Sequence, residues 1–138
     1  RGINQYTKAG RELIHKELNK NNLKYLKYLL ENTIKSETIE YNDNRISLYV
    51  GQQGKCAITK EILTPHNMHC HHKIPKELNG TDEYSNLIFV TADVHRLIHS
   101  TKIETINKYL NKLVLDKLQI KKINKLREMA NLKPITDI

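Results

Sequence analysis

Six of the seven histidines in this 138-residue chain lie between His66 and His99. At the end of that stretch, His95 and His99 are four residues apart, a spacing that places both imidazoles on one face of a helix, where they can bind one metal ion. His71 would supply a third nitrogen ligand and leave one coordination position open for water or phosphate. A histidine pair at this spacing is by itself more often a solvated helix face, so the residues around it decide its meaning.

His71 and His72 are neighbours on a predicted strand, 68–74, that runs into Pro75. Neighbouring side chains of a strand point to opposite faces unless the strand ends there, and Pro75 indicates that it does. Two imidazoles at the end of a strand can have different roles, because one can bind a metal ion while the other acts as a base.

The chain before this region is predicted to be largely helical. A cap at Thr7 begins a helix that continues to about residue 19, and leucines at spacings of three and four predict a second helix over 23–34. The polar segment 35–44 is predicted to be a linker or turn. Apolar and polar residues then alternate over 45–50, which predicts a strand.

The chain after His72 is predicted to form another strand and then three helices. A loop around Gly80 precedes the apolar run 87–90, which predicts a buried strand. Thr91 is expected to cap the helix that carries His95 and His99. Two further amphipathic helices are predicted over 103–114 and 120–129.

The composition indicates a polyanionic partner. The chain has 23 Lys and Arg against 15 Asp and Glu, a net charge of +8. Residues 1–50 carry nine basic and six acidic side chains, residues 51–100 five of each, and residues 101–138 nine and four, so the excess lies in the flanks. A pair of solvated helices is the other interpretation of these lysines.

Several protein classes are excluded or disfavoured. No run approaches the roughly 20 apolar residues of a membrane span, and no secretory segment is present, so an integral membrane protein is excluded. Two cysteines make no disulfide framework, which favours the reducing cytoplasm. Because the chain begins at Arg1, we expect it to be a fragment of a longer protein.

Three consecutive stretches together resemble the HNH nuclease motif. They are Met68–Pro75, Asn86–Val90 and His95–His99, with His72, Asn86 and His95 at the signature positions. The family's asparagine precedes its last histidine by nine residues, as Asn86 precedes His95 here. The resemblance covers about residues 55–100 and implies an α+β fold, a small ββα-metal (HNH) core flanked by basic N-terminal and C-terminal helices.

The resemblance also implies a metal-dependent DNA endonuclease that works as a monomer and nicks one strand, leaving a 5′ phosphate and a 3′ hydroxyl. His72 would be the general base, and Asn86 would hydrogen-bond the loop backbone and hold His72 in position. His71 and His95 would bind one divalent ion, with His99 as a third ligand or a phosphate contact. Arg96 and Lys73 would contact DNA, although an exposed helical arginine is equally consistent with Arg96.

The wider chain resembles the C-terminal region of group II intron-encoded reverse transcriptase/maturase proteins. Residues 41–49 and 54–59 are similar to the beginning of the endonuclease domain of those proteins. This implies a basic helical DNA-binding segment over 1–40 and an HNH domain over 41–138, with double-stranded DNA, intron RNA and a reverse transcriptase domain of the same native chain as partners. The DNA contacts expected from the first segment are Arg11, Lys16, Lys20, Lys24 and Lys27.

Three alternatives stay open. The chain could be a free-standing homing or phage-type HNH nuclease, a catalytically silent nucleic-acid-binding module, or a structural zinc domain that contacts another protein. The complete set of His71, His72, Asn86 and His95 favours an enzyme over the last two.

The metal expectations rest on the ligand types. Many HNH domains bind a structural zinc through two Cys-x-x-Cys pairs, but here these positions are Cys56 with Thr59 and Thr91 with Val94. We therefore expect no structural zinc, and we expect Cys56 and Cys70 to be buried apolar residues. Imidazoles prefer Zn²⁺, Ni²⁺ or Mn²⁺ to Mg²⁺. The family resemblance implies Mg²⁺ or Mn²⁺ in function, with Zn²⁺ a plausible occupant in a crystal.

Overall fold

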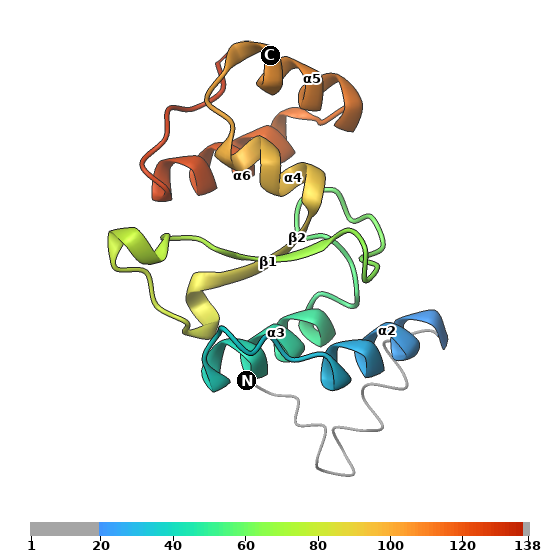
Figure 1. The fold of residues 1–138 in the computed structure, drawn as a ribbon. Coiled ribbons are helices and arrows are strands. Elements are labelled where there is room, and N and C mark those ends of the chain that lie inside the picture. The colour runs from blue at the N-terminus through green and yellow to red at the C-terminus, as the bar shows by residue number, and fades with distance from the viewer. Residues whose placement is uncertain (1–19, 137–138) are drawn as a thin grey trace.

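The computed structural model describes residues 20–136 as an α+β fold in which a two-stranded sheet lies between two groups of helices (Figure 1). Helices α2 and α3 cover one side of the sheet, and α4, α5 and α6 lie on the other. The elements are α2 (Lys20–Glu31), α3 (Ile39–Gly51), β1 (Met68–His72), β2 (Leu87–Thr91), α4 (Ala92–His99), α5 (Ile103–Leu113) and α6 (Lys117–Met129), with short 3₁₀ turns at Lys76–Leu78 and Tyr84–Asn86.

The sheet register decides which histidines face which helices. β1 and β2 are antiparallel, and Cys70 is paired with Phe89 while His72 is paired with Leu87. Phe89 meets the ring of Tyr49 in α3 edge to face, with 6.2 Å between ring centroids, so this face of the sheet packs on α3. Because side chains alternate along a strand, His71 points to the opposite face, toward α4.

The strand predicted over 45–50 is wrong, because this segment lies in α3. The linker or turn predicted over 35–44 is confirmed only for residues 35–38, because α3 begins at Ile39. The Thr38 hydroxyl caps this helix by accepting a hydrogen bond of 3.0 Å from the Tyr41 amide. Tyr41, Leu48 and Tyr49 are buried at helical spacing. The alternation over 45–50 spans only six residues, which is too few to distinguish a strand from part of a buried helix.

The remaining described elements largely follow the predictions. α2 ends at Glu31 rather than at residue 34, and α6 begins at Lys117, after a capping box formed by Asp116 and Gln119. The Thr91 hydroxyl accepts a hydrogen bond from the Val94 amide, which confirms the predicted cap of α4. The helix predicted over 7–19 lies outside the described residues.

One core connects the layers. It includes Leu26 and Leu29 of α2, Tyr49 of α3, Phe89 of β2 and Leu97 of α4, all at most 5% exposed. Cys56 and Cys70 are both buried, as expected. Residues 40 and 41, between which the sequence suggested a division, both lie in α3. None of the described helices has the length and apolar character that crossing a membrane requires.

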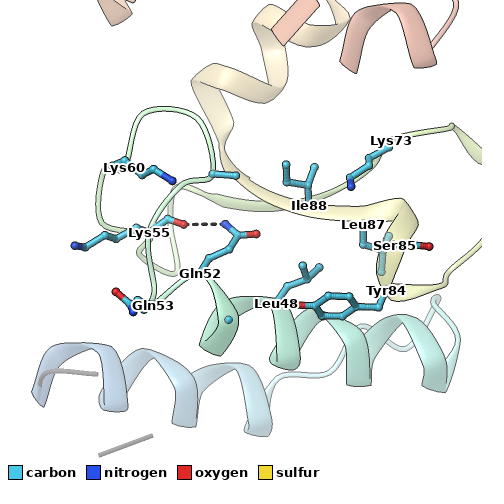
Figure 2. A pocket seen from close by; sticks show the side chains of 12 residues that line it. Leu48, Gln52, Gln53, Lys55, Lys60, Lys73, Tyr84, Ser85, Leu87 and Ile88 are labelled. Carbon is cyan, nitrogen blue, oxygen red and sulfur yellow. Dashed lines mark hydrogen bonds between the residues drawn. The ribbon is translucent and has the colours of Figure 1, made fainter. Parts of the chain in front are cut away.

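The segment that follows α3 is attached to the edge of the sheet by the side chain of Gln52 and by a main-chain hydrogen bond of 3.1 Å from the Ala57 amide to the Phe89 carbonyl. The Gln52 amide donates to the Lys55 carbonyl oxygen at 2.8 Å (Figure 2). It also donates to the Phe89 carbonyl oxygen at 2.9 Å, and its own oxygen accepts from the Phe89 amide at 3.0 Å. These bonds occupy the hydrogen-bonding groups of Gln52, so its role is structural.

Candidate metal centre

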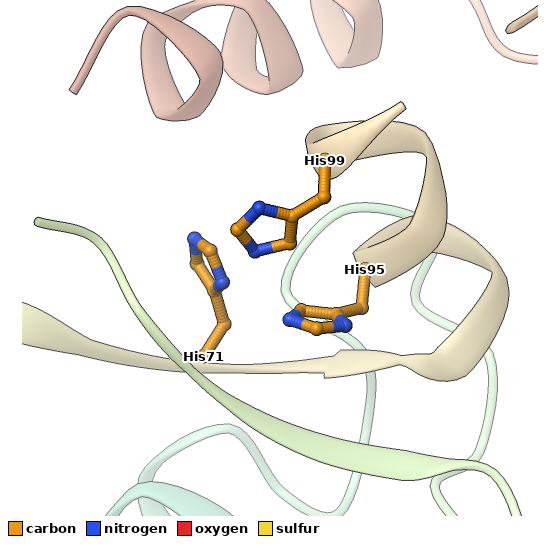
Figure 3. A group of neighbouring side chains, drawn as sticks. All are labelled: His71, His95 and His99. Atoms are coloured by element: carbon orange, nitrogen blue, oxygen red, sulfur yellow. The ribbon is translucent and has the colours of Figure 1, made fainter. Parts of the chain in front are cut away.

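Three imidazoles converge on one point from two elements. His71 projects from β1, and His95 and His99 project from successive turns of α4 (Figure 3). Each offers a ring nitrogen, and these nitrogens all lie within 4.8 Å of one another. Zinc–nitrogen bonds are about 2.0–2.1 Å long, so the nitrogens would have to move closer together for one ion to bind all three. The described part of the chain therefore contains a group that can hold a metal ion.

The surroundings keep these imidazoles neutral. Burial is the main cause that lowers the pKa of His71 to about 3, and the charges of His99 and His69 act in the same direction. The pKa of His95 is likewise lowered to about 3, by burial first and then by His69 and His99. A neutral imidazole has a lone pair available for a metal, whereas a protonated one does not. The group is therefore in its ligand form at neutral pH.

One orphaned atom supports a metal at this position. His71 is 2% exposed, and its Nε2 is buried with no hydrogen-bond partner among the described residues. A buried polar nitrogen without a partner costs about 1–3 kcal/mol, and a metal ion bound through Nε2 would satisfy it. The three-nitrogen donor set suits a borderline divalent cation such as Zn²⁺, so the residues present fit a divalent metal ion.

A fourth imidazole, His69, was not assigned a role from the sequence. It lies on the same face of β1 as His71 and stacks on the ring of His95, with 3.7 Å between centroids. Burial lowers its pKa, and the nearby His99 adds to the effect. Its spacing of two residues from His71 on a strand is the signal that would have placed it here.

His72 lies on the other face of β1 but lines the same pocket. This pocket has a volume of about 280 Å³ and is lined by His71, His72, His95 and His99, among others. The ring of His72 stacks on Tyr41 of α3, with 5.2 Å between centroids and 12° between planes. Its Nε2 is bonded to Oδ1 of Asp82 at 2.8 Å, which leaves Nδ1 as the nitrogen free for chemistry.

Asp82 is a buried carboxylate with several partners. Thr38 donates a hydrogen bond of 2.7 Å to its second oxygen, and the ammonium of Lys76 lies 3.5 Å from the first. Burial on its own would raise the pKa of Asp82, but hydrogen bonds from His72 and Thr38 and the charge of Lys76 outweigh burial and lower that pKa. Sequence reasoning missed Asp82, because a lone aspartate after a glycine is an ordinary loop residue.

Asn86 makes the loop contacts that the sequence predicted for it. Its side-chain oxygen accepts from the Ile74 amide at 2.9 Å, and its nitrogen donates to the carbonyl oxygens of Ile74 at 3.1 Å and Thr81 at 2.8 Å. These bonds fasten both ends of the loop that connects His72 with Asp82. Asn86 therefore stabilises the segment that brings the carboxylate to the imidazole.

The residues predicted to contact DNA are not gathered at the histidine pocket. Lys24 and Lys27 are exposed on α2, which begins at Lys20 and lies on the opposite side of the sheet from α4 (Figure 1). Arg96 is exposed on α4 and donates to the Tyr109 hydroxyl at 3.0 Å. Lys73 is half-buried and lines a different pocket. Two further predicted contacts, Arg11 and Lys16, lie outside the described residues.

Comparison of the chain with protein-family models, with curated proteins and with solved structures finds no match.

Proposed function

We propose that this protein is a metal-dependent DNA endonuclease with an HNH-type ββα-metal core, which nicks one strand and leaves a 5′ phosphate and a 3′ hydroxyl. One observation carries the proposal: the imidazoles of His71, His95 and His99 and the carboxylate-bonded imidazole of His72 line a single pocket. Hydrolysis of a phosphodiester needs a base for water and stabilisation of charge on the phosphate, and this pocket contains candidates for both.

The base is His72. Asp82 accepts a hydrogen bond from the protonated Nε2, so the Nδ1 lone pair is free to accept a proton from an attacking water. The geometry follows that of carboxylate–imidazole pairs, in which the carboxylate fixes the tautomer and orientation of the ring. Asp82 is in this proposal a positioning residue, and Asn86 supports it by holding the loop.

His71, His95 and His99 are the metal ligands of the proposal. A divalent ion bound by these three residues would supply Lewis-acid stabilisation of charge on the phosphate and on the leaving 3′ oxygen. Mg²⁺ or Mn²⁺ is the proposed functional metal. The rigid spacing of the ligands on α4 and β1 would hold the phosphate next to His72.

The biological setting we propose is group II intron mobility, in which the 3′ hydroxyl primes reverse transcription. It rests on the resemblance of residues 41–49 and 54–59 to intron-encoded proteins and on the net charge of +8, which suits a DNA and RNA partner. In that setting the chain is a monomeric part of a longer cytoplasmic protein that also contains a reverse transcriptase.

Plasmid nicking tests the proposal. We would compare the native chain with His72→Ala in EDTA, Mg²⁺, Mn²⁺ and Zn²⁺, with His66→Ala as the matched control because His66 is exposed and lies outside the pocket. We expect metal-dependent nicking that falls about 10²–10⁴-fold in His72→Ala and is retained in His66→Ala. Equal nicking by the native chain and His72→Ala would refute the base. DNA binding without nicking under any condition would favour the silent binding module.

A further inference from the structure

A second pocket opens between the C-terminal end of α3 and β2 (Figure 2). Its volume is about 570 Å³, roughly twice that of the histidine pocket. We call it the lysine cleft, and it is defined by Leu48, Lys55, Lys60, Lys73, Tyr84 and Ile88. Nothing in the function proposed above uses this cleft as a whole.

The cleft is cationic. Three lysines line it and no aspartate or glutamate does, and none of the three takes part in an ion pair among the described residues. Lys60 and Lys73 extend their ammonium groups from opposite ends toward the space over Ile88, whereas Lys55 points outward (Figure 2). Two unpaired cations facing each other over an apolar floor attract a chain that carries repeated negative charges.

The backbone holds Lys60 in place. Lys60 lies within a turn that is closed by a hydrogen bond of 2.8 Å from the Cys56 amide to the Glu61 carbonyl, and the Lys60 amide donates to the Cys56 carbonyl at 3.1 Å. Lys60 itself has a left-handed φ of 65°, which costs a non-glycine residue about 1 kcal/mol or more. The structure therefore maintains a strained turn that presents this lysine at the cleft.

An aromatic ring completes the cleft. Tyr84 is 42% exposed, so part of its ring is accessible to a ligand. Its hydroxyl lies against Gly51 at the end of α3, so closely that a Cβ on Gly51 would be 3.0 Å from it. Exposed aromatic rings beside lysines are the usual platform on which proteins stack bases and sugars of nucleic acids.

The lysine cleft adjoins the histidine pocket along the chain and across the sheet. Lys73 directly follows His72, and Leu87, which is paired with His72, also lines the cleft. We propose that the cleft binds the strand that flanks the cut, with Lys60 and Lys73 on phosphate groups and Tyr84 against a base or sugar. This inference rests on the proposed function, because it extends the substrate from the cut phosphate to its neighbours.

The experiment measures DNA binding in EDTA, so that it does not depend on cleavage. A fluorescently labelled short duplex is titrated with the full chain at several salt concentrations, and the slope of log affinity against log salt counts the phosphate contacts. We expect Lys60→Ala/Lys73→Ala to reduce that slope by about two. The matched control is Lys121→Ala/Lys125→Ala, which removes two exposed lysines of α6, on the other side of the sheet.

Tyr84 provides a second, uncharged test. Tyr84→Ala should weaken binding roughly 5- to 100-fold at an unchanged salt slope, whereas Tyr84→Phe, which keeps the ring, should bind as the native chain does. Thermal melting of each variant shows that it is folded.

Two outcomes overturn the cleft inference. The first is an equal reduction of slope by the cleft variant and the α6 control, which means that charge alone drives binding. The second is that polyglutamate binds the native chain as tightly as the duplex does, and that the cleft variant loses as much affinity for polyglutamate as for the duplex. That result would assign the cleft to acidic polypeptides. Failure of the nuclease proposal is distinguishable from failure of the cleft inference. If the native chain does not nick DNA, the nuclease proposal fails, but the binding measured in EDTA still tests the cleft.

Discussion

The imidazole of His72 and the carboxylate of Asp82 are joined by a hydrogen bond of 2.8 Å that connects the end of β1 to the loop before β2. The carboxylate is ionised, because its hydrogen bonds and the charge of Lys76 outweigh the effect of burial on its pKa. An ionised carboxylate only accepts, so the proton of His72 is held on Nε2 and Nδ1 stays open. The proposed base is thereby oriented by a residue ten positions away.

The first prediction concerns Asp82→Asn. The amide is nearly isosteric and can turn its NH₂ group to Nε2, which would move the proton of His72 to Nδ1. We expect the nicking rate to fall at least roughly tenfold, and by no more than the 10²–10⁴-fold that a general base contributes, while the affinity for DNA stays unchanged. Single-turnover nicking and fluorescence anisotropy measure the two quantities.

The control for this prediction is Asp43→Asn, which removes the same charge from an exposed position of α3. Nitrogen NMR of His72 reports the tautomer directly and separates positioning from folding. A native nicking rate in Asp82→Asn, or a tautomer that does not change, would show that Asp82 has no positioning role.

The second prediction decides the role of His99. If it is the third ligand, His99→Ala weakens Zn²⁺ binding by more than the roughly 10- to 100-fold that loss of an outer-shell partner costs. His71→Ala should do the same, because both nitrogens belong to the converging group. Isothermal titration calorimetry with Zn²⁺ measures this, and His66→Ala is the control. Unchanged Zn²⁺ affinity in His99→Ala would make His99 a phosphate contact instead.

The third prediction is a pH dependence of the metal-free protein. In the folded state the pKa of both His71 and His95 is lowered from 6.5 to about 3, so protons bind the unfolded chain first. The free energy of unfolding is then highest above pH 6.5 and decreases as the pH falls from there toward 3, by up to about 1.4 kcal/mol per pH unit for each histidine.

Urea unfolding in EDTA at about pH 7, 6 and 5 measures this dependence in a range where few carboxylates titrate. Replacing His71 and His95 by glutamine should reduce the slope over that range to the smaller part that comes from His69 and His99, whose pKa is also lowered by burial. A native protein whose stability is constant between these pH values would show that the two imidazoles are not buried as neutral groups.

The fourth prediction concerns Arg127 of α6, which is 3% exposed. One guanidinium nitrogen donates to the carbonyl oxygens of Leu97 at 2.8 Å and Ser100 at 2.8 Å, and so binds the C-terminal end of the helix that carries His99. We expect Arg127→Ala to lower the free energy of unfolding by about 3 kcal/mol and to weaken metal binding, since α4 loses its anchor.

Chemical denaturation tests this expectation, and Lys125→Ala, an exposed substitution on the same helix, should change stability by less than about 0.5 kcal/mol. Arg127→Lys should lie between the two, because one ammonium cannot reproduce the guanidinium fork. Equal stabilities of the Arg127→Ala and Lys125→Ala variants would mean that the carbonyl contacts contribute nothing.

The parts of the site that depend on local geometry could be predicted from the sequence. A spacing of four on a helix puts His95 and His99 on one face whatever surrounds them, and the Thr91 cap depends on an amide three residues away. The loop bonds of Asn86 were expected from the resemblance and are present. The role of Asn86 in catalysis stays a prediction.

The wrong prediction of a strand over 45–50, where the structure has α3, also has a physical reason. Ile46, Leu48 and Val50 alternate with polar or aromatic residues, and a strand and a helix bury such a short pattern almost equally well. The helix forms because the Thr38 cap begins it and because Tyr41 and Tyr49 then face the sheet, where Tyr41 donates to the Cys70 carbonyl at 2.8 Å. That partner is 29 residues away and cannot be read from the local pattern.

The sequence by itself determined the chemistry that is available here: the set of histidines, their spacing on α4 and the basic flanks. Only the tertiary structure decided which groups meet. Asp82 reaches His72, Arg127 reaches the end of α4, and Lys60 faces Lys73 because loops and helix packing bring distant segments together. Such contacts depend on the burial of a shared core, whose energy is spread over many residues and leaves no local pattern in the chain.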